Sequence, residues 1–424
     1  VAGLRTHQAK MDVIGNNIAN VNTPGFKKSR VTFQDSMSQT MKGASSPQGN
    51  RGGTNPMQVG LGMTIAAIDT IHSPSSVEST GNMTDLAIEG AGYFIIAGDN
   101  MDTFYSRAGN FDFDRNGNLG NTATGLMVMG WQDKVNHTVP TDRTSQNIGR
   151  IEVKKGMMIE GKSTQNAVFA KNLNAETSNP IVDPATPGGS FTLPFEVYDS
   201  LGAEHNLAIT FTKVKDNEWS YEVSYNKITP VAGGEPTVEK VLIGTAGSLI
   251  FDGKGNINKP ATDWDSLTHT PEGGANPITF TPDFSQLTQY AKETSIDLAY
   301  QDGYAAGTLL GVTVDDKGVI SGVFDNGLNR ELAQVAVANF DNPGGLIKSG
   351  QNLYRFSNNS GNPQIGEAGG GGRGTIAPCA LEMSNVDLSE EFTQMIITQR
   401  GFQANSRIIT TSDEMLQELV NLKR

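Results

Sequence analysis

The feature that most constrains this 424-residue chain is a column of large apolar residues near its C-terminus. One such residue recurs at every seventh position, and Phe392 and Val420 flank the column, whose members are Leu388, Met395, Phe402, Ile409 and Leu416. A sevenfold apolar repeat is typical of a helix that packs against other helices in a coiled coil. Asp387 and Glu390 have the spacing of an N-terminal capping box. We therefore predict a long helix over 387–424.

Such a helix would be about 55 Å long at about 1.5 Å per residue. That length exceeds what a small globular core covers, so the narrow column is expected to pack against helices of the same kind. These helices can belong to the same chain or to neighbouring chains. An amphipathic helix docked on an ordinary core is the alternative. The length and narrowness of the column favour assembly between chains.

A second and weaker apolar stripe opens the chain. Its residues recur at sevenfold and interleaved positions, namely Leu4, Met11, Ile14, Ile18 and Val21. His7 interrupts the stripe, and Asn16, Asn17 and Asn20 are mediocre helix formers. Pro24 with the following glycine ends a helix. We predict a helical segment over 1–24 that pairs with the C-terminal helix.

Between the helices, the chain from about Ser76 to Ala377 reads as β-structure. Apolar and polar residues alternate most clearly over 191–197, 207–211 and 219–225, as they do in half-buried strands. The 49 glycines exceed the usual share of about 7% and supply many turns between short strands. The sequence thus predicts a mainly β fold with α-helical termini, built from sandwiches or open barrels.

A stretch of weak periodicity, from Lys27 to about Ser79, separates the first helix from the β-structure. It includes a glycine-, serine- and proline-rich run at 42–56. Loops longer than about 12–15 residues usually carry function or lack fixed structure. We expect either a mobile tether or a segment that becomes ordered against a partner.

Composition excludes several classes of function. The formal charge of −13 and the pI near 4.9 argue against a nucleic-acid-binding protein, because phosphates require clustered Lys and Arg. No run of 18 or more apolar residues is present, so membrane insertion is not expected. The chain begins with Val1 and shows no secretory signal, and we expect a few initiating residues to precede it.

No catalytic, cofactor-binding or metal-binding set is predicted. The histidines are scattered, without the spacing of a helical metal pair. Asp112, Asp114, Asn116 and Gly117 imitate the start of a calcium loop, but the twelfth position is Ala123 instead of a bidentate Glu. We interpret this string as a hairpin turn.

The single cysteine, Cys379, excludes an internal disulfide and a cysteine-cluster metal site. It is either a reactive or cross-linking thiol or a small semi-buried residue. The second interpretation is favoured because Arg373 is the only nearby cation that would promote a thiolate.

Two terminal segments carry a family resemblance. Residues 16–33, NNIANVNTPGFKKSRVTF, resemble the N-terminal signature of bacterial flagellar axial proteins, which form the rod, the hook and the hook-associated structures. Residues 381–423 are similar to the C-terminal signature of the same family. Residues 86–119 resemble the first β domain shared by the distal rod and hook members. Residues 195–219 resemble the outer domain that the hook members carry.

The resemblance implies a four-part organisation that the composition does not show. Two β-rich domains, with the outer one inserted into the first, would be joined by a linker to paired N- and C-terminal coiled-coil helices. The implied boundaries are 1–24 and 386–424 for the inner helical domain, 25–75 and 378–385 for the extended linker, 76–149 and 294–377 for the first β domain, and 150–293 for the outer β domain. At Cys379 the family motif commonly has glycine or another small residue.

The resemblance also implies a mechanical function and no enzyme activity. The chain would self-assemble into the hook, a bendable tube that transmits torque from rod to filament outside the cell. Its implied partners are further copies of itself, the distal rod, the hook cap, the hook–filament junction proteins and the flagellar type III export apparatus, through whose channel it would leave the cell. No cofactor is implied.

Two other functions stay open at this point. A distal-rod-like protein should lack the outer domain, which 195–219 argues against. A surface adhesin or enzyme with polymerising ends should have an exposed aromatic or paired-carboxylate site in that domain. The aromatic residues to watch are Trp219, Tyr221 and Tyr225, whose regular alternation favours core positions.

Overall fold

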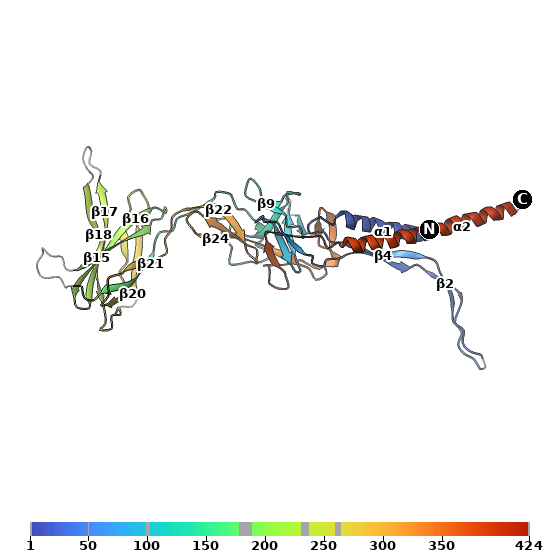
Figure 1. The fold of residues 1–424 in the computed structure, drawn as a ribbon, viewed down its shortest axis with the longest axis horizontal. Helices are drawn as coiled ribbons and strands as arrows, with labels where there is room; N and C mark the ends of the chain where they lie inside the picture. Colours follow the sequence, from blue (N-terminus) through green and yellow to red (C-terminus); the bar gives the residue numbers. More distant parts are fainter. Residues whose placement is uncertain are drawn as a thin grey trace. The chain divides into compact units, whose positions relative to one another are not determined.

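The computed structural model describes residues 2–49, 51–98, 102–177, 189–229, 237–258 and 264–422. Helix α1 spans Ala2–Ala19, helix α2 spans Leu388–Leu422, and the chain between them is mainly β-structure (Figure 1). The predicted fold class, mainly β with paired terminal helices, is confirmed. No helix in these ranges combines the length and the hydropathy that a membrane span requires.

The chain divides into two compact units. The terminal unit comprises Val1–Lys155, Val312–Gly322 and Asn329–Arg424, and the central unit comprises Gly156–Gly311 and Val323–Leu328. The central unit is therefore formed by residues that lie, in sequence, between parts of the terminal unit. The finer four-part division implied by the resemblance stays a prediction.

Most strands of the terminal unit belong to one large sheet, and the others form strand pairs. The sheet follows the order β13 (Met158–Ile159), β22, β23, β24, β11, β7, β8, β27 and β26, with β9, β10, β12, β25 and β28 alongside; β13 and parts of β22 and β23 are residues of the central unit. Its strands are β22 (Gly307–Val314), β23 (Val319–Phe324), β24 (Asn329–Val335), β11 (Met127–Trp131), β7 (Tyr93–Ala97), β8 (Thr103–Ser106), β27 (Leu353–Arg355), β26 (Ile347–Gly350), β9 (Phe111–Phe113), β10 (Leu119–Asn121), β12 (Gly149–Arg150), β25 (Val337–Asn339) and β28 (Gln364–Gly366). A short 3-10 helix, η2, spans Pro343–Gly345.

The remaining strands of the terminal unit form antiparallel pairs. Two of these pairs join segments far apart in sequence, so that the chain returns from the β-structure beside the place where it entered. The pairs are β1 (Ser29–Asp35) with β4 (Met63–Thr70), β2 (Ser38–Lys42) with β3 (Met57–Gly60), β5 (Val77–Ser79) with β30 (Ala380–Glu382), and β6 (Leu86–Glu89) with β29 (Thr375–Pro378).

The central unit consists of two sheets around an aromatic core. One sheet has the order β15 (Ser190–Tyr198), β16 (Glu204–Lys215), β17 (Glu218–Thr229) and β18 (Thr237–Ile250). The other has the order β19 (Leu267–His269), β20 (Ile278–Tyr290), β14 (Asn166–Asn174) and β21 (Asp297–Gln301), and the short β13 (Met158–Ile159) pairs with β22. The alternation predicted over 191–225 is confirmed, because its apolar residues line the core.

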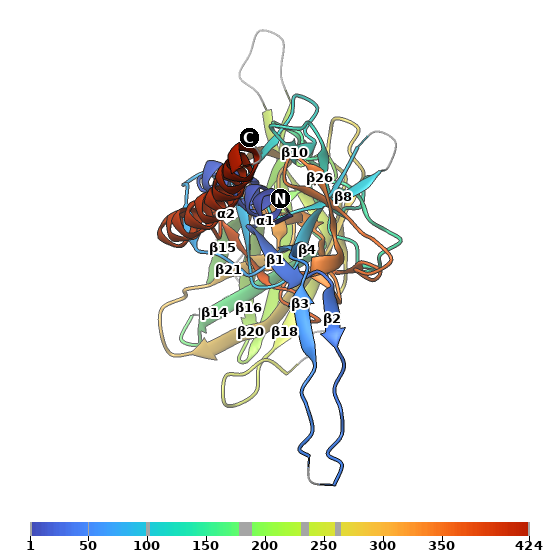
Figure 2. The ribbon, with the colours of Figure 1, turned by 90° about the vertical axis from the view of Figure 1, so that its right-hand side faces the viewer.

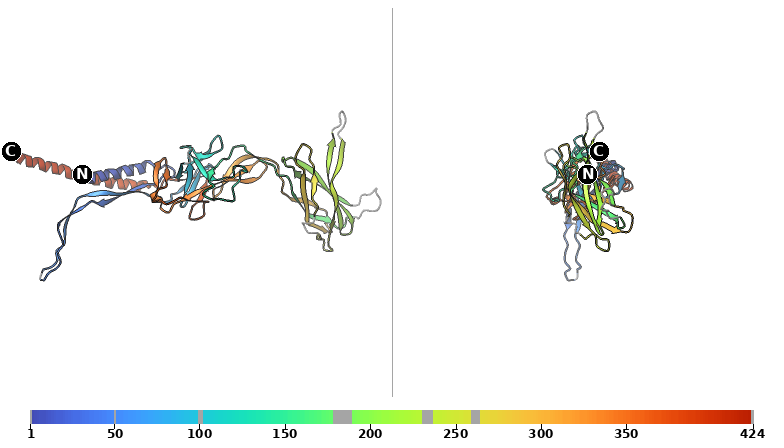
Figure 3. Two further views of the ribbon diagram at one scale, coloured as in Figure 1. Left: turned by 180° about the vertical axis from the view of Figure 1, so that it is seen from behind. Right: turned by 90° about the vertical axis from the view of Figure 1, so that its left-hand side faces the viewer.

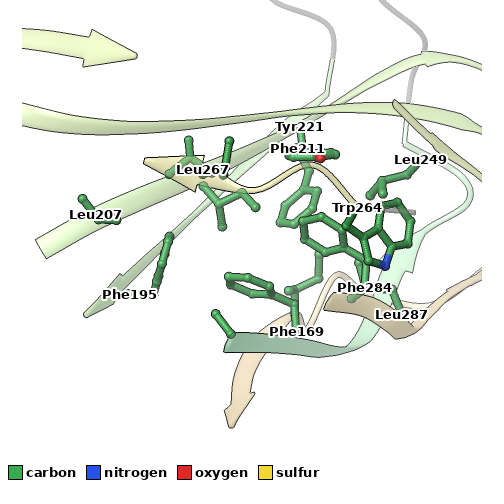
Figure 4. Close-up of a cluster of buried hydrophobic side chains, with 14 of the residues drawn as sticks. Phe169, Phe195, Leu207, Phe211, Tyr221, Leu249, Trp264, Leu267, Phe284 and Leu287 are labelled. Atoms are coloured by element: carbon green, nitrogen blue, oxygen red, sulfur yellow. The ribbon is translucent and has the colours of Figure 1, made fainter. Parts of the chain in front are cut away.

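Phe284 lies at the centre of that core (Figure 4). Its ring centroid is 5.4 Å from Phe169, 4.7 Å from Tyr221 and 5.2 Å from Trp264. Trp219 and Tyr221 are buried in the same cluster, and Tyr225 packs against it. These aromatic residues are therefore core residues, as their alternation predicts.

Four turns share one local geometry. The Oδ1 atom of an aspartate accepts the backbone N–H groups of the second and fourth residues after it, at N–O distances of 2.7–3.0 Å. The third residue after each aspartate is a glycine with φ between 76° and 88°, a conformation that other residues adopt with strain. The turns begin at Asp114, Asp199, Asp252 and Asp315.

The turn at Asp114 contains residues that imitate the start of a calcium loop. Both carboxylate oxygens bond within the turn, since Oδ2 accepts from Asn118 Nδ2 at 2.9 Å. The turn closes the β9–β10 hairpin, so the hairpin interpretation is confirmed. The described residues contain no cluster suited to a metal ion.

Lys27–Ser79 is not a tether without regular structure, whereas the alternative, a segment that becomes ordered against a partner, stays a prediction. The segment contains β1 to β5, and two strand pairings in it are irregular, at Thr32/Phe33 and at Thr40/Lys42. At each irregularity the side chains that follow switch to the opposite face of the strand pair. Apolar and polar residues then no longer alternate along the whole strand, so the sequence pattern does not indicate a strand.

The Phe284→Ala substitution is predicted to destabilise the central unit by about 3–5 kcal/mol, because it leaves a cavity among the rings of Phe169, Phe211, Tyr221 and Trp264. Chemical denaturation followed by tryptophan fluorescence measures the loss. Tyr300→Ala is the control, since Tyr300 is 60% exposed and its loss should change stability by less than about 0.5 kcal/mol. Equal effects of the two substitutions would contradict the assigned core.

Candidate functional site: the paired terminal helices and their junction

The terminal helices lie side by side and antiparallel (Figures 1 and 2). A Cβ atom on Gly3 would lie 3.0 Å from Asn405 Nδ2, and one on Gly401 would lie 2.8 Å from the ring of His7. Farther along, Lys10 Nζ donates to Gln394 Oε1 at 2.9 Å. The two glycines thus allow close approach of the helices at one end of the pair.

The seam between α1 and α2 is largely polar. The buried residues of α2 are Glu391 and Thr398, and those of α1 are Thr6, Ile14 and Asn17. Asn17 Nδ2 donates to Glu391 Oε2 at 3.2 Å. Polar seam residues fix the register of a helix pair and contribute little hydrophobic energy.

The predicted apolar column lies beside this seam and not within it. On α2, Met395 and Phe402 are half-buried. On α1, Leu4, Met11 and Ile18 are also half-buried. The other members and flanking residues are 39–70% exposed, namely Leu388, Phe392, Ile409, Leu416 and Val420. The helices of one chain therefore leave most of the column uncovered.

A second apolar stripe on α2 was missed by the search for a single column. It consists of exposed residues offset from the column, namely Ile397, Ile408, Met415, Leu419 and Leu422, which are 57–82% exposed. Successive residues of an α-helix are rotated by about 100° about its axis. The column therefore lies on one side of the α2 surface that faces α1, and the second stripe lies on the opposite side. A search for two interleaved sevenfold patterns could have found them.

Helix α1 is shorter than predicted. It ends at Ala19 instead of reaching Pro24, and Val21 lies in the turn that follows. The cause is the run of asparagines, whose side chains compete for backbone groups. The side chain of Asn17 makes two hydrogen bonds with the backbone of Ser29. Its Nδ2 donates to the Ser29 carbonyl at 2.8 Å, and its Oδ1 accepts from the Ser29 N–H at 3.0 Å.

Asn385 makes a similar attachment at the start of α2. Its Oδ1 accepts from the Lys28 N–H at 2.7 Å, and its Nδ2 donates to the Ile71 carbonyl at 2.8 Å. Asp387 caps the helix, since its Oδ1 accepts the N–H groups of Ser389 at 2.8 Å and Glu390 at 3.2 Å. The helix pair is thus tied to the β1–β4 strands by two asparagine side chains.

A buried ionic cluster lies where the helices meet the β-structure of the terminal unit. Glu382 Oε1 accepts from Lys27 Nζ at 2.7 Å and from the Ser75 N–H at 3.0 Å, and Oε2 lies 3.3 Å from Arg107 Nη1. All three charged side chains are at most 2% exposed. Arg107 also donates to the carbonyls of Ile88 and Gly90.

His72 lies against this cluster as a neutral imidazole. Its Nδ1 is 2.7 Å from the Tyr93 hydroxyl, and its ring packs edge-on against Tyr354. Burial, together with the charges of Lys27, Lys348 and Arg107, lowers the pKa of His72 to about 4. Burial likewise lowers the pKa of Lys27, against the attraction of Glu382.

Cys379 occupies a turn between β29 and β30. Its φ is 57°, a left-handed conformation that favours glycine, and its Sγ lies 3.0 Å from Met83 Sδ. The cysteine is half-buried, as the structural interpretation predicts.

The Glu382→Gln substitution is predicted to destabilise the terminal unit by about 3–5 kcal/mol, because it leaves two buried cations without their counter-charge. Urea denaturation monitored by circular dichroism measures this loss. Glu390→Gln is the matched control, since the Lys28–Glu390 pair is partly exposed and should contribute less than about 1 kcal/mol. A neutral Glu382→Gln variant would show that the buried cluster is not needed for stability.

Stability should also fall on acidification through His72. The unfolded chain protonates this histidine near pH 6.5, whereas the folded chain resists protonation down to about pH 4. Between those pH values the unfolded state therefore binds more protons than the folded state. The free energy of unfolding decreases as pH falls from about 6.5 to about 4. The measurement is unfolding free energy against pH for the native chain and for His72→Gln. Identical slopes over that window would refute the assignment.

The matches to family models cover both ends and the middle of the chain. The models are described as "Flagella basal body rod protein" (residues 1–27), "Flagellar hook protein FlgE/F/G D1 domain" (87–153), "Flagellar basal body protein FlaE D2 domain" (172–304) and "Flagellar basal body rod FlgEFG protein C-terminal" (377–422).

Relatives extend over the whole chain. The chain is 41% identical over 443 residues to the flagellar hook protein FlgE of Borreliella burgdorferi and 37% identical over 460 residues to that of Treponema pallidum, with 100% of this chain and 98% of each relative covered. The crystal structure of the Helicobacter pylori flagellar hook protein FlgE2 matches with a TM-score of 0.52 at 16% identity, covering 73% of this chain and all of that one. That likeness concerns the fold. With paired terminal helices and full-length relatives of this kind, the chain belongs to the flagellar hook protein family FlgE, whose members are structural subunits of the hook and not enzymes.

Proposed function

We propose that the terminal helices form the inner layer of the hook tube and that the apolar residues exposed on α2 make the contacts between subunits. Two observations carry this proposal: the seam between α1 and α2 is polar, and α2 is the longer helix. Because Gly3, near the start of α1, lies beside Asn405, α2 continues past α1 (Figure 1), and its apolar residues from Ile408 to Leu422 are exposed. The proposed packing residues are Leu4, Met11, Ile14, Ile18, Val21, Leu388, Phe392, Met395, Phe402, Ile409, Leu416 and Val420. Among them Ile14 is buried within the chain, so its packing is between α1 and the rest of the same subunit.

The energy of assembly follows from burial. Covering a large apolar side chain contributes about 1.5–3 kcal/mol, so several such contacts per subunit offset the loss of freedom on association. One helix with two stripes can contact helices on two sides. Such a helix fits a closed layer of many helices better than an isolated pair.

Torque would pass from the helices to the β-structure through the junction. Asn17 bonds Ser29 at the start of β1, and Asn385 bonds Lys28 just before β1 and Ile71 just after β4. Glu382 joins Lys27 to Arg107 in a buried cluster. Buried charge pairs resist separation, because parting them exposes an uncompensated charge. We propose that this junction keeps twist within the inner layer, while contacts between the β-rich units slide as the tube bends.

The same assembly implies the remaining partners. The helices of the first and last subunits would contact the distal rod and the hook–filament junction proteins, and growth would occur under a hook cap. Export through the flagellum's own type III channel would place the chain outside the cell. The adhesin alternative has less support, since the aromatic residues Trp219 and Tyr221 are buried in the central core.

The Leu416→Asp substitution is predicted to abolish tube formation while the monomer stays as stable as the native chain. Leu416 is 61% exposed in the monomer, whereas burying the new charge between helices is costly. Sedimentation and negative-stain electron microscopy measure tubes, and thermal unfolding measures the monomer. Phe402→Asp should also block assembly, with some loss of helix pairing.

Gln403→Asp is the matched control, because Gln403 is exposed on α2 and belongs to neither stripe. It should leave tube formation unchanged. Tubes formed by Leu416→Asp in normal yield would overturn the helical inner layer.

A further inference from the structure

The chain enters and leaves the two sheets of the central unit through two segments that lie side by side (Figure 3). Residues 160–165 lead from β13 into β14, and residues 302–306 lead from β21 into β22. Lys162 and Tyr304 exchange two backbone hydrogen bonds between the segments, at 3.0 and 3.1 Å. These two segments are called the entry and exit segments below.

The aspartate turn between β15 and β16 packs directly against both segments. A Cβ atom on Gly202 of this turn would lie 2.6 Å from the Ala306 N, and one on Gly161 would lie 2.4 Å from the Gly202 Cα. Backbone therefore meets backbone, with no room for a side chain between them. Whatever holds the Asp199 turn in place also holds the entry and exit segments against the sheets.

A histidine holds this turn. Asp199 is 3% exposed, and its Oδ2 lies 2.9 Å from His205 Nε2. Burial opposes ionisation of the carboxyl, but the hydrogen bonds from His205, Ala203 and Leu201 lower the pKa of Asp199 below its usual range. The ionised carboxylate can only accept, so His205 Nε2 carries a proton. A further proton on the ring would be balanced by the carboxylate beside it.

A second histidine lies against the first and belongs to the other sheet. His205 is on β16, whereas His269 ends β19, and their ring centroids are 5.4 Å apart. His269 is 5% exposed and packs against Tyr225 of β17 at 4.5 Å. Burial, together with the charge of His205, lowers the pKa of His269. The site therefore accepts one proton far more readily than two.

The titratable and charged groups around the two rings come from each neighbouring element. Asp199 approaches from the turn, and Tyr225 approaches from β17. Farther along, Lys227 of β17 and Glu272 of the loop after β19 form an exposed ion pair at 3.6 Å. That pair has no net charge and is screened by solvent, so Asp199 is the counter-charge for the histidines among the described residues.

Strand β19 is well placed to move. It has three residues, lies at the edge of its sheet and pairs with β20 over Leu267–His269. The loop that follows it contacts the Asp199 turn, since the Asn276 N–H donates to Ser200 Oγ at 3.0 Å. Short edge elements with few contacts open at a low cost in free energy. A displacement of His269 would therefore reach the turn.

We propose that Asp199, His205 and His269 form an acid-sensitive latch on the central unit. A single proton on His205 is balanced by Asp199 and keeps the turn closed on the entry and exit segments. A second proton, on the buried His269, is repelled by the first and releases β19 together with the turn. The latch is a property of one chain, so it goes beyond the proposed function and does not depend on tube formation.

Titration of the histidines tests the coupling between the two rings. Histidine signals of the full-length monomer are followed by NMR from about pH 8 to about pH 4, and loss of one signal in His269→Phe assigns that residue. We expect His269 to titrate below the usual value of about 6.5. In His205→Gln its midpoint should rise by about one pH unit, because glutamine still donates to Asp199 but carries no charge. An unchanged midpoint would overturn the latch.

Hydrogen exchange of the monomer tests the opening. A histidine whose pKa is lowered in the closed form binds protons better when open, so the closed form loses stability as pH falls below about 6.5. After correction for intrinsic exchange rates, residues 198–206 and 160–165 should exchange about tenfold faster at about pH 5 than at about pH 7, the factor for a pKa lowered by one unit.

Two variants separate the latch from general acid effects. His269→Phe keeps an aromatic ring against Tyr225 and cannot be protonated, so the acid-induced rise in exchange should vanish. His137→Asn is the control, because it removes a histidine of the terminal unit at a φ of 47°, which asparagine tolerates, and it should leave the rise intact. Equal rises in native chain and His269→Phe, or no rise in the native chain, would refute the latch and leave the proposed function untouched.

Discussion

The carboxylate of Glu382 is the group on which the two ends of the chain converge. It bonds Lys27, from the segment between α1 and β1, and Ser75, from the segment between β4 and β5, and it lies beside Arg107, which directly follows β8 of the large sheet. Its own backbone carbonyl accepts from the Gly25 N–H at 2.8 Å. Because removing water from a lone carboxylate is costly, these partners must all be in place together. The direction in which α2 leaves the β-structure follows from that requirement.

The distribution of polarity on α2 separates two tasks. Residues facing α1, such as Glu391 and Thr398, fix the register within one chain, while the apolar residues on either side stay available. If the seam were apolar, the apolar surface of α2 would be buried against α1 of the same chain and would not be available to another chain. In the proposed assembly, a polar seam would favour association between chains over closure within one chain, at a modest cost in the stability of the pair.

Much of the fold could be predicted from local patterns. The sevenfold column and the Asp387 cap predicted α2, and the alternation over 191–225 predicted the strands of the central core. The β2–β3 hairpin escaped prediction because an irregular register breaks its alternation. The roles of Asn17, Lys27 and Glu382 depend on residues hundreds of positions away. A single sequence contains no local signal for such pairings, although the resemblance of residues 16–33 marked the segment that contains two of them.

The four aspartate turns have a consequence for how firmly the hairpin ends are held. Each turn satisfies two of its own backbone N–H groups through its own side chain, and the amide and backbone donors of Asn118 help to hold the pKa of Asp114 below its usual range. In three of the turns the glycine carbonyl also accepts a backbone N–H from another segment: Gly117 from Val153 at 2.7 Å, Gly255 from Gln289 at 2.8 Å and Gly318 from Val335 at 2.8 Å. A hairpin end that is closed by its own side chain and anchored to a second segment has few donors left to pair. Such turns therefore act as rivets that keep each hairpin in place while its outer surface stays free.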